Sequence, residues 1–137
     1  MTPIRMLMPI ESPDKERATI AAFADQANSG VILLWDSLLA IRRASILATA
    51  GYYHVPTITD ALSCEDGTGL INYGPDAVEV YRGAASYVDR ILKGAKPIDL
   101  PVQMPSKFSL RMNLRLARYM GLTIPASFVR TADEVWD

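Results

Sequence analysis

The sequence contains few of the residues from which metal and nucleophile sites are built. Among 137 residues there is one cysteine, Cys64, and one histidine, His54. A single cysteine excludes an internal disulfide framework, and this pair alone cannot complete a zinc site. The two residues flank one expected strand, with no third group to orient a nucleophile. We therefore expect no metal, no cofactor and no Cys–His catalytic pair.

The sequence also lacks an excess of either charge. Fourteen basic and fifteen acidic residues give a net charge of −1, too small to draw the chain to nucleic acid or to an anionic membrane. The basic pairs Arg42–Arg43 and Arg115 with Arg118 have no aromatic residues between them, so they are typical of solvated helix faces. We expect no nucleic-acid partner.

Long apolar runs are missing as well. No segment approaches the roughly 20 apolar residues that cross a bilayer, so we expect no membrane insertion. The first residues, MTPIRMLMPIESPDK, contain only a short apolar run that Arg5 interrupts, and no small-residue cleavage site follows it. As written, the sequence would predict a cytoplasmic protein.

Common catalytic motifs are absent too. The sequence has no GxGxxG or GxxxxGK[ST] phosphate loop, no GxSxG turn and no HExxH helix. Asp36 and Asp60 could form a carboxylate pair for acid–base chemistry. Because acids at strand ends are commoner as helix caps and ligand anchors, we predict no catalytic residue and no enzyme.

What the sequence does contain is a regular alternation of strand and helix patterns. Half of the residues are hydrophobic and 21% are charged, which suits one soluble domain with one core. Apolar runs of strand length occur at 4–10, 31–34, 55–59 and 69–73. A helical pattern follows each of them except the run at 55–59, after which a polar loop or a short helical turn is expected at 60–68. Parallel strands joined by right-handed crossovers follow from this order. The predicted fold is a three-layer α/β/α sandwich with a mostly parallel sheet.

The helix after the run at 69–73 has the clearest signals. A turn is expected at Gly74–Pro75, Asp76 is placed as the N-cap, and Glu79 has the spacing of a capping box. Gly94 ends the helix. We expect Val88 and Leu92 to pack on the sheet. They belong to one apolar stripe at helical spacing, formed by Val78, Tyr81, Ala85, Val88 and Leu92.

The remainder is expected to be a proline-rich connection at 96–106 and a tail. The tail pattern predicts a strand at 107–112, a short helix capped by Asn113 and a last helix from Pro125 to about Trp136. We expect residues 1–106 to form the α/β lobe and residues 107–137 to pack on that lobe or on a partner, with one domain overall.

Several long segments resemble a known family. They are YGPD, RGAASYVDRILKGAKPIDLPVQ and PSKFSLRMNLRLARYMGLTIPASFVRTADEVWD, and the likeness extends back through VILLWDSL and HVPTITDALSCEDGTGLINYGPD. They resemble the C-terminal portion of the ABC-transporter substrate-binding proteins whose better-known members bind aromatic amino acids. The resemblance implies one lobe of a periplasmic-binding-protein-like fold, a small solute as ligand, a separate first lobe, an ABC permease as partner and an extracytoplasmic location.

The carboxyl ends of the strands are the expected binding site, because ligands of open parallel sheets bind there. Carboxylates would hold a ligand ammonium and aromatic rings its flat body. Helix capping by Asp36, an Asx turn at Asp60 and core packing of Trp35 are the structural alternatives. The predicted ligand-binding residues are Trp35, Asp36, Ser37, Thr59, Asp60, Asn72, Tyr73 and Gly74.

The resemblance bears on three of these residues. It implies that Asp36 and the loop at Thr59–Asp60 line a cleft between two lobes. Trp35 departs from the family pattern, in which proline or a small residue is expected, so a bulky indole would alter the cleft.

Two functional interpretations follow. In the first, the chain is a solute-binding lobe. In the second, it is a stand-alone interaction protein whose apolar residues after Lys107 hold a homodimer.

Overall fold

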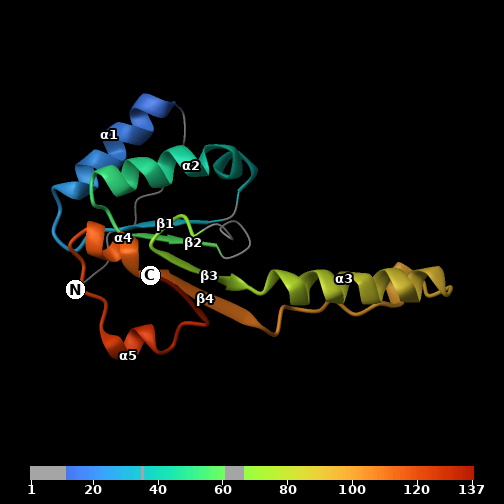
Figure 1. The fold of residues 1–137 in the computed structure, drawn as a ribbon. Helices are drawn as coiled ribbons and strands as arrows, with labels where there is room; N and C mark the ends of the chain where they lie inside the picture. Colours follow the sequence, from blue (N-terminus) through green and yellow to red (C-terminus); the bar gives the residue numbers. More distant parts are fainter. Residues whose placement is uncertain (1–11, 35, 61–66) are drawn as a thin grey trace.

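The computed structural model describes residues 12–34, 36–60 and 67–137, which form a five-stranded sheet (Figure 1). The strands lie in chain order, from β1 to β5. Strands β1 to β3 are mutually parallel, β4 is antiparallel to β3, and β5 is parallel to β4. The mostly parallel α/β fold predicted from the sequence is therefore confirmed, while the strand expected at 4–10 lies outside the described residues. The strands are β1 (Val31–Leu33), β2 (Thr57–Thr59), β3 (Ile71–Pro75), β4 (Phe108–Asn113) and β5 (Glu134–Trp136).

Two helices, α1 (Pro13–Ala24) and α2 (Ser37–Tyr52), cover one face of the sheet (Figure 1). Ser12 caps α1 as expected, since its hydroxyl accepts a hydrogen bond of 3.3 Å from the Lys15 N–H. The apolar faces of the two helices meet the sheet in one continuous core. Its buried members are Ile20, Leu33, Ile46, Leu47, Ala50 and Val55.

A buried ion pair joins the two helices. Glu16 is 2% exposed, and Arg42 of α2 lies 3.0 Å from its carboxylate. The Ser45 hydroxyl donates a hydrogen bond of 3.4 Å to the other oxygen of the same carboxylate. A buried carboxylate needs such partners, because an uncompensated charge in the core is strongly destabilising. Arg42, expected on a solvated face, is therefore part of the packing between helices.

The opposite face of the sheet is much more open. Along each strand, side chains alternate between the two faces. Leu33, Thr57 and Thr59 are buried, whereas their neighbours Ile32 and Ile58 are 66% and 38% exposed. The short helix α5 (Ala126–Val129) lies on this side of the sheet in Figure 1.

The tail after Lys107 contributes two strands to the same sheet. Asn113 caps α4 (Leu114–Tyr119), as predicted, by accepting a 2.7 Å hydrogen bond from the Leu116 N–H. Leu70, Ala117 and Met120 form a second small core.

The prediction of one long helix from Pro125 to about Trp136 is wrong, because α5 ends at Val129 and the chain continues as strand β5. Asp133 fixes this strand beside β4, because its backbone N–H donates to the Leu110 carbonyl and its carboxylate accepts from the Leu110 N–H, both at 2.8 Å. These are long-range bonds, which a local helical pattern does not reveal.

The helix α3 (Ala77–Leu92) departs most from the sequence predictions. Asp76 caps it and Gly94 follows it with φ of +99°, as expected. However, α3 has no buried residue, and it projects away from the sheet (Figure 1). Val88 and Leu92, predicted to pack on the sheet, are 55% and 82% exposed, so that prediction is wrong.

Backbone pairing explains the direction of α3. Gly74 and Pro75, expected as a turn, belong to β3 and pair with Ser109 and Phe108 of β4. The neighbouring strand is antiparallel, so the chain does not need a helix that doubles back across the sheet. Half of the expected capping box is also missing, because the Asp76 N–H donates to the Lys107 carbonyl at 3.0 Å.

Candidate functional site

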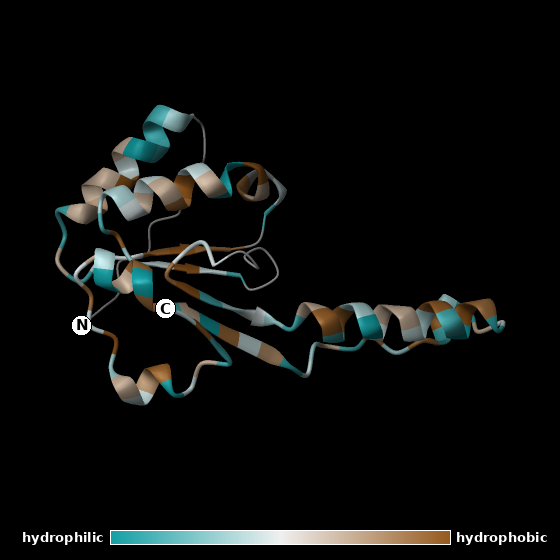
Figure 2. Ribbon diagram, viewed as in Figure 1, coloured by the Kyte–Doolittle hydropathy of each residue, from teal (hydrophilic) through white to brown (hydrophobic). Residues whose placement is uncertain are grey.

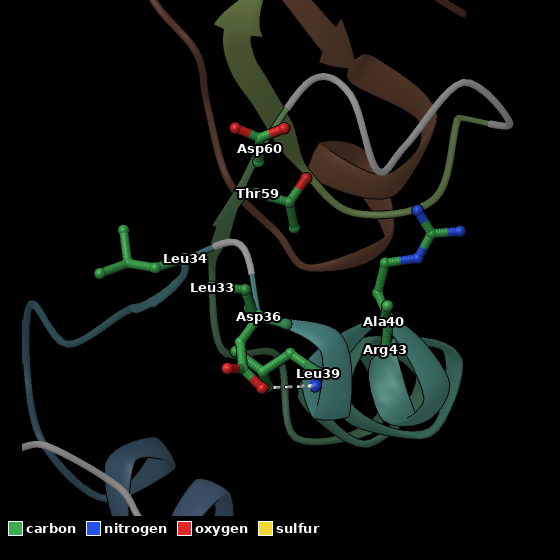
Figure 3. A pocket seen from close by; sticks show the side chains of 8 residues that line it. All are labelled: Leu33, Leu34, Asp36, Leu39, Ala40, Arg43, Thr59 and Asp60. Carbon is green, nitrogen blue, oxygen red and sulfur yellow. Dashed lines mark hydrogen bonds between the residues drawn. The ribbon is translucent and has the colours of Figure 1, made fainter.

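A shallow pocket lies where β1 and β2 end and α2 begins (Figure 3). Its volume is about 20 Å³, roughly the space that one water molecule needs. This surface alone cannot enclose an amino acid, because small-molecule sites usually measure hundreds of Å³. The lining residues are Leu33, Leu34, Asp36, Leu39, Ala40, Arg43, Thr59 and Asp60.

Asp36 caps the helix that forms one wall. Its carboxylate accepts a hydrogen bond of 3.4 Å from the Leu39 N–H, shown as the dashed line in Figure 3. Ser37 is the first residue of α2 and is exposed. Trp35 lies outside the described residues. The capping role expected as an alternative for Asp36 is thus present, and the carboxylate still lies at the pocket wall.

Thr59 and Asp60 form the other wall, at the end of β2. The Thr59 hydroxyl donates to Oδ1 of Asn72, which is completely buried on the neighbouring strand. Nδ2 of Asn72 is also buried, and within the described structure it has no hydrogen-bond partner. Asn72 therefore lies behind Thr59 and supports the pocket without lining it.

The last two predicted residues do not join this group. Tyr73 follows Asn72 directly, so its side chain lies on the other face of the sheet. It is 54% exposed and stacks on Phe108, with ring centroids 5.8 Å apart. Gly74 is buried in the ladder with β4. The structure thus brings together Asp36, Thr59 and Asp60, with Asn72 behind them.

Arg43 is a pocket residue that the sequence analysis did not select. It follows Asp36 by two helical turns, and residues at that spacing lie on the same face of a helix. The spacing from Asp36 was therefore the signal in the sequence that could have identified Arg43 as a pocket residue. The residues that line the pocket therefore include two carboxylates, a guanidinium group and a hydroxyl.

The described residues contain neither a membrane-spanning helix nor a metal-binding cluster. Within residues 12–34, 36–60 and 67–137, no helix is long and apolar enough to cross a membrane. The same residues contain no group of three or more His, Cys, Asp or Glu side chains placed to hold a metal ion.

A family model described as "ABC transporter substrate binding protein" matches residues 10–136. The chain belongs to this family. The match takes in the pocket, α3 and the tail, so it includes every element described above. Among curated protein sequences, none matches the chain.

Three solved structures share the fold of this substrate-binding family member. A conserved domain protein from Vibrio cholerae O1 biovar El Tor is 25% identical with a TM-score of 0.76, and the match covers 90% of this chain and 41% of that one. An ABC domain from Streptococcus pneumoniae, in complex with L-Trp, is 22% identical with a TM-score of 0.75, covering 90% and 42%. A substrate binding protein with adhesive properties from Clostridium difficile, in a ligand-free, open structure, is 15% identical with a TM-score of 0.63, covering 91% and 41%.

These comparisons confirm a periplasmic-binding-protein-like α/β fold. They also show that this chain spans about two fifths of the length of each protein it matches. More than half of each of those proteins has no counterpart in these 137 residues.

Proposed function

We propose that this chain is one lobe of the solute-binding component of an ABC transport system. Its role is to contribute one wall of a site for a small solute and to present the loaded receptor to a permease. The observation that carries the proposal is the pocket formed by Asp36, Arg43, Thr59 and Asp60, in a chain of the substrate-binding family.

The pocket chemistry favours an amino acid as the solute. Asp36 and Asp60 can attract an ammonium group, while the planar Arg43 guanidinium can donate two parallel hydrogen bonds to a carboxylate. The Streptococcus pneumoniae neighbour was solved with L-Trp, which contains both groups. Free L-amino acids, with L-Trp first, are therefore the ligands to test.

A single lobe should bind its solute weakly. A pocket of about 20 Å³ leaves most of an amino acid in water, so the solute gains only part of the contacts that an enclosed site provides. Each lost 1.4 kcal/mol of binding free energy raises the dissociation constant about tenfold. We expect millimolar binding by this chain alone.

Titration of the isotope-labelled chain with L-Trp, followed by amide NMR, tests this proposal. We expect shifts at Thr59 and Asp60 and in the first turn of α2. Asp36→Asn should weaken binding at least tenfold, because asparagine still caps the helix but does not attract an ammonium group. Its melting temperature should remain within about 2 °C of wild type.

Asp89→Asn is the matched control, since Asp89 lies on α3, where it pairs with Lys93 at 2.8 Å, and it does not line the pocket. It should bind L-Trp like the wild type. Amide shifts that spare the pocket with every amino acid tested, or an Asp36→Asn variant that binds normally, would rule out the proposed site.

A homodimer held by residues after Lys107 is the second proposal. Phe108, Phe128 and Val135 are 46%, 41% and 38% exposed, which leaves apolar surface on the tail. Met112 and Ala117 of the same tail are buried within their own chain, so the surface is smaller than the sequence alone indicates.

A further inference from the structure

The sheet consists of two parts that meet between β2 and β3. Strand β1 and Val55, just before β2, belong to the first core with α1 and α2, and Figure 2 shows hydrophobic bands on β1 and α2. Leu70, just before β3, belongs to the second core with α4. The pocket lies entirely in the first part, because every residue that lines it belongs to β1, β2 or α2 or adjoins one of them. We call the boundary between β2 and β3 the seam.

Backbone pairing across the seam is short. Among the described residues, Ile58 pairs with Ile71 and Thr59 with Asn72, which makes two residue pairs. By comparison, three pairs join β1 to β2 and five join β3 to β4. So short a ladder fixes the alignment of the two strands weakly by itself, and side chains therefore have to select it.

Two threonine side chains of β2 form hydrogen bonds across the seam. The Thr57 hydroxyl accepts a hydrogen bond of 3.1 Å from the Leu70 N–H, and the Thr59 hydroxyl donates to Oδ1 of Asn72. Thr57, Thr59 and Asn72 are all 2% exposed or less, so water does not compete for these bonds. Each bond connects the first part of the sheet to the second.

Together the two bonds select one alignment of β2 with β3. A shift by one residue would place Asn72 opposite Ile58 or Asp60, whose side chains alternate with that of Thr59 and so point to the other face. A shift by two residues in either direction would leave one of the two threonines opposite neither Leu70 nor Asn72. The observed alignment gives both threonines a partner on the second part of the sheet.

Asn72 does not stabilise the interior as an apolar residue would. Its Nδ2 is buried and has no hydrogen-bond partner within the described structure, and a buried donor without a partner destabilises the fold. Two apolar side chains of similar shape at positions 59 and 72 would remove this effect. A polar pair that is retained in spite of a loss of stability is typical of residues that select one alignment among several, as a buried asparagine does in coiled coils.

We propose that Asn72 is a positioning residue of the solute site, because its bond to Thr59 fixes the alignment of β2 with β3. Thr59 is the last residue of β2 and, with Asp60, forms one wall of the pocket. With the alignment fixed, this wall keeps one place relative to β3 and to the strands beyond it. This role rests on the proposed solute site, whereas the alignment itself can be measured without any solute.

The test replaces the pair by apolar residues of similar shape, Thr59→Val with Asn72→Leu, in the whole 137-residue chain. Amide NMR without solute then gives the number of signals from the two strands and the contacts between Ile58 and Ile71, which lie opposite each other. We expect one set of signals in the wild type, and doubled or exchange-broadened signals for residues 57–60 and 70–73 in the double variant. The melting temperature of the double variant should equal or exceed that of the wild type, because the unpartnered Nδ2 is removed.

Two further variants are controls. Thr59→Ser retains the hydroxyl that donates to Asn72, so it should keep one set of signals. Ile58→Val changes a residue of β2 that does not line the pocket, and it should keep one set of signals and bind L-Trp like the wild type. In a titration with L-Trp followed at the Asp60 amide, the double variant should bind at least threefold more weakly than the wild type.

Three results would overturn the proposal. One sharp set of signals in the double variant, with the Ile58–Ile71 contacts of the wild type, would show that the pair does not set the alignment. A double variant that melts lower than the wild type, or fails to fold, would show that the pair serves stability instead. A double variant with doubled signals that binds L-Trp as tightly as the wild type would show that the alignment does not position the pocket. If L-Trp binds neither the wild type nor any variant, the solute site is overturned, and the signals of the solute-free chain still decide whether the pair sets the alignment.

Discussion

Asp76 connects the start of α3 to Lys107, which precedes β4. Its carboxylate accepts a hydrogen bond of 3.1 Å from the Glu79 N–H and lies 2.9 Å from Nζ of Lys107. The hydrogen bond from Lys107, followed by that from Glu79, lowers the pKa of Asp76, and the same bond raises the pKa of Lys107. With the hydrogen bond from the Asp76 N–H to the Lys107 carbonyl, these contacts hold the start of α3 beside the start of β4.

These pKa shifts predict a pH window for the contact between Asp76 and Lys107. The lowered pKa of Asp76 means that its ionised carboxylate stabilises this contact above the ordinary value of about 4, and this stabilisation disappears as the pH falls through the folded-state pKa. A raised lysine pKa stabilises it below about 10.4, and this stabilisation disappears as the pH rises through the folded-state value. We expect faster exchange of the Glu79 amide, after correction for intrinsic rates, at both limits.

Lys107→Met is the control for this prediction. It should abolish the alkaline change and move the pKa of Asp76 toward its ordinary value. Since both side chains reach solvent, the global melting temperature should change little. An Asp76 carboxyl that titrates identically in the variant and the wild type would contradict the assignment.

At the scale of elements, α2 and α3 show that helices with similar apolar sequence patterns can bury their apolar side chains to very different extents. Both are 16-residue helices that follow a strand. The helix α2 leads to a parallel strand and crosses over the sheet, so Ile46 and Ala50 are completely buried. The helix α3 leads to an antiparallel strand and extends beyond the sheet.

This difference predicts unequal effects of shortening one aliphatic side chain in each helix. Ile46→Ala should lower the free energy of unfolding by about 2–5 kcal/mol, because it leaves a cavity in the core. Leu92→Ala should change it by less than about 0.5 kcal/mol, because Leu92 is 82% exposed. Urea unfolding of both variants gives the comparison, and equal losses would contradict the direction of α3 described here.

At the scale of the whole molecule, two surfaces remain for partners. One lies on residues 76–107, where α3 and the segment that returns beside it expose apolar side chains. The other is the exposed part of the tail with Phe108, Phe128 and Val135, which the second functional proposal assigns to a copy of the same chain. The two surfaces involve different residues, so substitutions can change one without the other.

Light scattering of the purified chain tests whether residues after Lys107 hold a homodimer. A homodimer held there should dissociate in Phe128→Ser, because the apolar side chain is removed from the interface while β5 is retained. Arg130→Ser, two residues away and exposed, should leave the mass unchanged. A wild-type chain that remains monomeric at high micromolar concentration would exclude this homodimer.

The sequence by itself determined the features that depend on neighbouring residues. Ser12, Asp76 and Asn113 cap helices where the capping patterns predict them, and Gly94 ends α3. The apolar runs at 31–34, 55–59 and 69–73 contain β1, β2 and the first part of β3. Caps and strand propensities act within a few residues, so they can be identified without knowing what the segment packs against.

Only the tertiary structure decided which surface the apolar face of each helix or strand packs against. The stripe of α3 was identified correctly, but its partner was not, because helix periodicity does not say whether the next strand is parallel or antiparallel. Tyr73 was grouped with Asn72 although alternate side chains of β3 lie on opposite faces. Arg43 reaches the pocket, and Glu134–Trp136 becomes a strand, through contacts between residues far apart in the chain. Such contacts depend on how the chain packs as a whole, so patterns of neighbouring residues do not determine them.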